Sequence, residues 1–76
     1  MSKKIDIKEI TSKEQLQELN LSFEEVYAML EKIVDLQEKG DVILEDSIKF
    51  YKIGKILAEY AQDILQKAKL EIEKVN

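Results

Sequence analysis

The side chains in this sequence that could do chemistry are carboxylates in adjacent pairs, Glu24-Glu25 and Glu45-Asp46. Carboxylate oxygens in such pairs suit Mg²⁺. However, 37% of the residues are charged. Neighbouring acids in a helical chain usually form a solvated face, or lie in a first turn where they interact with the helix dipole. We therefore expect these pairs to bind no metal ion, and we expect no cofactor.

Other catalytic groups are missing from the sequence. It has no His and no Cys, so it lacks the common general base, the thiol nucleophile and the soft zinc ligands. Ser22 and Ser47 have no His to activate them. The two glycines stand alone, whereas a phosphate-binding loop needs several close together. We therefore expect no catalytic residue in this chain.

Direct binding to nucleic acid is also disfavoured. The net charge is −4 and all twelve basic residues are Lys, whereas chains that bind phosphate by themselves are usually basic and often use Arg. The five aromatic residues fall on apolar stripes, and the ridge of Lys49, Lys52 and Lys55 is most simply the solvated side of a helix. A base-stacking surface would instead need exposed rings in a basic groove.

Length and composition predict one all-α domain. The chain has 76 residues, no Pro and two Gly, a composition typical of helices. No apolar run is long enough to span a membrane, and the start lacks the apolar core of a signal peptide, so we expect a cytoplasmic protein. A chain this short buries only about 60% of its unfolded surface. Without Cys for a disulfide, association with other chains is the usual remaining source of stability.

Two long helices are expected, over about residues 22–39 and 44–75, with a turn over about 40–43. Together they form a hairpin domain of residues 21–76. Gly40 supplies the left-handed conformation that ends a helix, and Asp41 follows it in the turn. The expected fold is a two-helix antiparallel hairpin, coiled-coil-like, with a long second helix that assembles with other helices.

The two long helices differ in how well the residues at their N-termini can cap them. Ser22 and Glu25 can form a reciprocal capping box for the first helix. Ile43 is a poor N-cap, so Asp41 or a frayed first turn is expected to begin the second.

Residues 1–20 form a charged and irregular segment before the hairpin. Ser12 and Gln15 could form a capping box for a short helix through Leu19. We favour a solvated, partly frayed tail, because termini without a buried face seldom stay ordered. The alternative is an arm that docks on another surface.

The apolar residues form more stripes than one hairpin can bury. In the second helix a 3-4 seam of coiled-coil type consists of two lines with a seven-residue repeat: Tyr51, Ala58, Leu65 and Ile72, and Gly54, Ala61, Ala68 and Val75. Beside this seam runs a second stripe of larger residues: Phe50, Ile53, Leu57, Tyr60 and Ile64. The first helix also has two adjacent stripes. Two stripes suggest two neighbours, one in the same chain and one in a partner. The residues expected at the partner interface are Phe23, Tyr27, Tyr51, Gly54, Ala58, Ala61, Leu65 and Ala68.

Residues 21 to about 72 resemble the small subunit of exodeoxyribonuclease VII. The segments that carry the resemblance are, in order, Phe23-Glu24-Glu25, Leu30-Glu31-Lys32-Ile33-Val34, Glu38-Lys39-Gly40-Asp41 and Leu44-Glu45-Asp46-Ser47, followed by Tyr51 and Gly54. Each segment alone is a common helical motif, but the ordered set with both glycines is specific. Gln37 departs from the pattern, which favours Leu there, so the end of the first helix is expected to be rotated or less buried.

The resemblance implies a non-catalytic subunit of a nuclease. The large subunit would carry the active site and degrade single-stranded DNA from both ends to short oligonucleotides. The implied partners are this large subunit and other copies of the chain itself, with DNA contacted only through the large subunit and no membrane. The alternative is a generic helical-hairpin adaptor or coiled-coil interaction protein without a nuclease partner.

Overall fold

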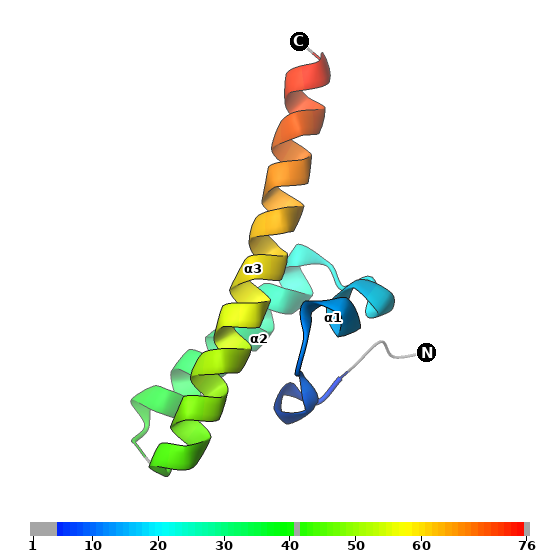
Figure 1. Ribbon diagram of the computed structural model, residues 1–76. Helices are drawn as coiled ribbons and strands as arrows, with labels where there is room; N and C mark the ends of the chain where they lie inside the picture. The colour runs from blue at the N-terminus through cyan, green and yellow to red at the C-terminus, as the bar shows by residue number, and fades with distance from the viewer. Residues whose placement is uncertain (1–4, 41, 76) are drawn as a thin grey trace.

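The computed structural model describes residues 5–40 and 42–75, with side chains described up to residue 72. The elements are a short 3-10 helix, η1 (Ile7–Glu9), and three α-helices, α1 (Lys13–Leu19), α2 (Phe23–Glu38) and α3 (Leu44–Val75) (Figure 1). No strand occurs within these residues. The expected all-α fold is confirmed, whereas the two-helix hairpin is only part of it: the fold also contains η1, which was not expected, and α1, the short helix that the capping box of Ser12 and Gln15 had suggested.

Helix α2 begins at the capping box expected from the sequence. The Glu25 backbone N–H donates to the Ser22 hydroxyl at 3.2 Å, and the Ser22 backbone N–H donates to the Glu25 carboxylate at 2.8 Å. These bonds satisfy two of the backbone donors that a helix N-terminus leaves without partners. Leu21 and Val26, which flank the capping box, are both buried, as a hydrophobic staple requires.

Helix α2 ends at the glycine turn. Gly40 has φ +71°, in the left-handed region, and its backbone N–H donates to the Gln37 carbonyl at 3.3 Å. The Lys39 ammonium lies 3.5 Å from the carboxylate of Asp35, which is four residues earlier. The positive φ expected for Gly40 is confirmed, whereas Asp41 lies outside the described residues.

Helix α3 determines the length of the molecule. Its 32 residues correspond to about 48 Å at 1.5 Å per residue, close to the longest extent of the chain, 49 Å. Helix α2 packs along the first part of α3 and runs in roughly the opposite direction, while the C-terminal end of α3 projects beyond the other elements (Figure 1). Glu45 and Asp46 lie in its first turn, where the helix dipole favours negative charge.

The core lies where α2, α3 and the N-terminal segment meet. Its buried residues come from all three parts and form one cluster: Ile10, Leu16, Leu21, Val26, Ile33, Phe50, Ile53, Leu57, Tyr60 and Ala61. Of the two stripes expected on α3, the one with the larger residues therefore faces inward.

The N-terminal segment differs from the solvated tail that we favoured. Ile10 and Leu16 are only 2% and 0% exposed, and both η1 and α1 pack against α3. Helix α1 begins after Ser12, whose backbone N–H donates to the Gln15 side chain at 3.1 Å, and ends at Asn20 with φ +53°. Residues 5–20 therefore form part of the fold.

Candidate partner interface

One side of the α2–α3 pair carries apolar side chains that the chain's own fold leaves exposed. We call this side the open flank and define it by Phe23, Tyr27 and Val34 of α2 and Tyr51, Ala58 and Leu65 of α3. Tyr51 is 70% exposed and Leu65 is 55% exposed. Because large apolar residues in a row are unusual on a monomer surface, the open flank is a candidate interaction surface.

A groove runs along the open flank where the two helices meet. It has a volume of about 500 Å³ and is lined by Leu30 and Val34 of α2 and by Tyr51 and Gly54 of α3, among others. At Gly54 an added Cβ would meet no atom within 4 Å. The absent side chain therefore leaves free space along the groove, and α2 does not approach α3 closely there.

The aromatic residues of α2 extend the open flank toward the start of that helix. The rings of Phe23 and Tyr27 stack, with centroids 6.1 Å apart and an interplanar angle of 17°. Tyr27 is 53% exposed and Phe23 is half-buried. Since stacked rings restrict each other's rotation, they form a preorganised apolar surface that would lose little side-chain entropy on binding.

Seven of the eight residues expected at a partner interface keep some exposure. Tyr27, Tyr51, Ala58, Leu65 and Ala68 are exposed, and Phe23 and Gly54 are half-buried. Ala61 differs, because it is 8% exposed and belongs to the core cluster of the chain itself. Ala61 therefore offers little surface to a partner in the fold of the isolated chain.

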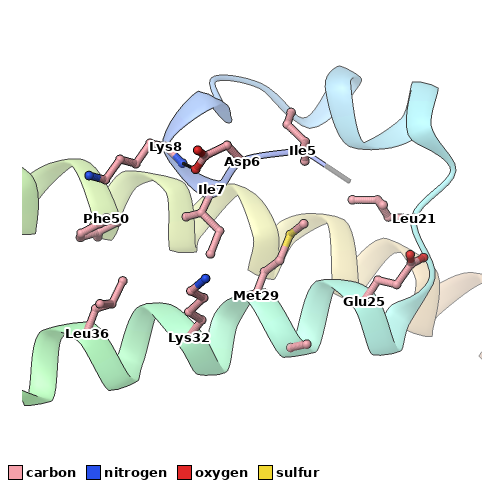
Figure 2. Close-up of a pocket in the computed structure, with 11 residues that line it drawn as sticks. Ile5, Asp6, Ile7, Lys8, Leu21, Glu25, Met29, Lys32, Leu36 and Phe50 are labelled. Atoms are coloured by element: carbon pink, nitrogen blue, oxygen red, sulfur yellow. Dashed lines mark hydrogen bonds between the residues drawn. The ribbon is translucent and has the colours of Figure 1, made fainter. Parts of the chain in front are cut away.

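The opposite side of the α2–α3 pair is covered by the N-terminal segment. A hollow of about 660 Å³ lies between residues 5–8 and α2, and Ile7 and Met29 extend into it from opposite sides (Figure 2). Asp6 accepts a hydrogen bond from the backbone N–H of Lys8 at 3.1 Å. The charged residues that line this hollow are Asp6, Lys8, Glu25 and Lys32.

Two long-range polar contacts hold the N-terminal segment in place. The Tyr60 hydroxyl donates to the Leu21 carbonyl at 2.8 Å, and the Lys13 ammonium lies 2.8 Å from the Asp63 carboxylate. Burial and the nearby charge of Glu25 raise the pKa of Tyr60, while the hydrogen bond and charge of Asp63 raise the pKa of Lys13. Sequence reasoning missed both contacts because each joins residues 39 or 50 positions apart.

The acidic pairs do not gather into a metal site. Glu25 is engaged with Ser22 at the start of α2, and Glu45 is exposed in the first turn of α3. Across residues 5–40 and 42–75, no group of three or more acidic, His or Cys side chains could hold a metal ion. In the same part of the chain, no helix combines the length and apolar character needed to cross a membrane.

Comparisons with known proteins give one consistent result. The sequence profile of a family described as exonuclease VII small subunit matches residues 23–74. Proteins named exodeoxyribonuclease 7 small subunit from Brucella melitensis biotype 1 and Rhizobium etli are each 44% identical to the chain, and one from Bartonella bacilliformis is 46% identical, all over 55 residues. Each match covers 72% of this chain and 66% of the relative, so the match spans just under two thirds of their length. No solved structure matches the chain significantly.

Proposed function

The chain belongs to the exonuclease VII small subunit family, and on this premise we propose that it acts as the non-catalytic small subunit of exodeoxyribonuclease VII. The large subunit then carries the active site and degrades single-stranded DNA from both ends to short oligonucleotides. This chain contacts DNA only indirectly, and it works in the cytoplasm, where chromosomal DNA is found. The observation that carries the proposal is the open flank, an exposed apolar surface on a chain without catalytic groups of its own.

The partner most suited to the open flank is another helix. A groove between two packed helices accepts side chains from a third helix in the ridges-into-grooves manner. The seam of Tyr51, Ala58 and Leu65 repeats every seven residues, which is the spacing that a neighbouring helix meets in coiled-coil packing. We therefore assign the open flank to helices of the large subunit, with other copies of the chain packed alongside.

A generic adaptor without a nuclease partner is the other candidate function. It would share the exposed apolar flank, but it gives no reason for the match to the nuclease subunit family over residues 23–74. We therefore favour the nuclease subunit.

The test is co-expression of the chain with its cognate large subunit, using Tyr51→Asp as the interface variant. Buried aromatic anchors contribute about 2 kcal/mol or more to an interface, so we expect affinity for the large subunit to fall roughly thirtyfold or more. Co-purification and nuclease activity should fall together. The matched control is Gln66→Asp, which also adds one negative charge to an exposed position of α3 but does not line the groove.

Circular dichroism of each isolated variant must show unchanged helix content. If Tyr51→Asp assembles and supports digestion as well as Gln66→Asp, the open flank is not the interface. The isolated wild-type chain should leave single-stranded DNA intact with Mg²⁺ present. Digestion by a preparation free of large subunit would contradict the non-catalytic role itself.

A further inference from the structure

Residues 5–21, which we call the strap, lie outside the part of the chain that matches the family, residues 23–74. They nevertheless contribute three buried residues, Ile10, Leu16 and Leu21, to the core cluster. Two polar contacts fasten them to α3, from Lys13 to Asp63 and from the Leu21 carbonyl to the Tyr60 hydroxyl. The strap is thus an addition to the hairpin that packs along its length.

The position of the strap determines which side of the hairpin another chain can reach. In the open flank, Tyr51 and Leu65 remain exposed. On the other side, Leu57 and Tyr60 belong to the same core cluster as Ile10 and Leu16 and are 0% and 7% exposed. The strap therefore packs in one apolar cluster with residues on this side of α3, and the Tyr60 hydroxyl donates to the Leu21 carbonyl there.

The outer surface of the strap is polar. Glu14, Gln17 and Glu18 of α1 are exposed, as are Lys8 and Glu9 around η1. Charged side chains are depleted at the centres of protein interfaces because their desolvation is costly. On this side of the hairpin, the strap therefore presents a charged surface to other chains, and such a surface disfavours the packing of another helix.

We propose that the strap is a built-in cover that prevents a second copy of the chain from packing on this side of the hairpin. A chain with two self-associating surfaces can form an open assembly that keeps adding copies, whereas a chain with one such surface forms a closed assembly. The strap therefore limits self-association. This proposal is tested on the chain alone and does not depend on the nuclease function.

The experiment releases the strap in the full-length chain with Leu16→Asp, which places a carboxylate at a position that is 0% exposed. Gln17→Asp is the matched control, because it adds the same charge to an exposed position on the same helix. Ile10→Asp releases the strap independently, at its other buried contact. The weight-average mass of each variant is measured by sedimentation velocity at equal concentration, together with amide hydrogen exchange along the chain.

We expect the mass of Leu16→Asp and Ile10→Asp to rise about twofold or more over wild type, while Gln17→Asp keeps the wild-type mass. The amides of α1 should exchange faster in the two release variants, and those of α2 and α3 should stay protected. If both release variants keep the wild-type mass while α1 exchanges freely, the strap does not limit association. If α2 and α3 lose protection as well, the strap is an essential part of the core and the proposal is also overturned.

Discussion

Gly40 and Gly54 should respond in opposite directions to the same substitution, although each is a glycine beside or within a helix. Steric hindrance does not limit substitution of either glycine, because an added Cβ would meet no atom within 4 Å at either position. The difference lies in the backbone. Gly40 has φ +71° at the end of α2, whereas Gly54 lies inside α3 with no positive φ.

The magnitudes follow from these conformations. Gly40→Ala forces a side chain into the left-handed region and should destabilise the isolated chain by about 1–2 kcal/mol. Gly54→Ala removes backbone freedom from the unfolded chain and should stabilise it by about 0.5–1 kcal/mol. For a domain of this size, 1 kcal/mol corresponds to a shift in Tm of about 4–8 °C. The two variants should therefore melt on opposite sides of wild type.

The assay is thermal unfolding of the isolated chain followed by circular dichroism at 222 nm, at one protein concentration for all variants. Gly40→Asn serves as the control, because Asn tolerates the left-handed conformation better than Ala and should lose less stability. A Gly40→Ala melt that coincides with wild type would refute the role of the left-handed turn. A Gly54→Ala melt below wild type would show that this position does not tolerate a side chain in the isolated chain.

Three further outcomes are expected. Leu16→Ala should destabilise the isolated chain by about 2–5 kcal/mol in a denaturant titration, because Leu16 is 0% exposed and its truncation leaves a cavity. Tyr60→Phe should cost about 1–2 kcal/mol by losing the hydrogen bond to the Leu21 carbonyl. Because the folded-state pKa of Tyr60 is raised above 10.0, the stability from its neutral form is complete below pH 10 and is lost as pH rises through the folded value. Tyr60→Phe should therefore flatten the stability profile of alkaline melts, whereas Tyr51→Phe, at an exposed position, should leave it steep. Lys13→Met should lower the melting temperature only slightly at low salt and still less at high salt, because the pair with Asp63 is partly exposed and solvent and ions screen it.

The ends of the helices could be predicted from the sequence because they depend on neighbours within a few residues. The capping box of Ser22 and Glu25 and the positive φ of Gly40 both follow the local rules that their residue types suggest. The same holds for the short helix after Ser12, whose backbone N–H bonds Gln15 three residues later. Such contacts require no knowledge of how the rest of the chain packs.

The pattern of apolar residues grouped the residues of α3 into stripes, and the structure shows which of these stripes is exposed. The seven-residue repeat placed Tyr51, Ala58 and Leu65 on one line of α3, and the structure leaves that line exposed. Ala61 was assigned to the interface with them, but it is buried in the chain's own core. The repeat shows which residues lie on the same stripe of the helix. It does not show whether a residue at the edge of that stripe packs inside its own chain or faces a partner.

Local sequence patterns predicted an all-helical chain, the ends of its two long helices and the short helix after Ser12, but not η1. The tertiary structure decided which stripe of α3 faces inward and how the strap packs. Ile10 and Leu16 belong to the segment of residues 1–20, which was expected to be a solvated, partly frayed tail. They are buried because they meet the side of α3 around Leu57 and Tyr60, in one core cluster. That burial depends on residues about 40 to 50 positions away in the chain. Contacts between residues so far apart produce no local sequence pattern from which they could be predicted.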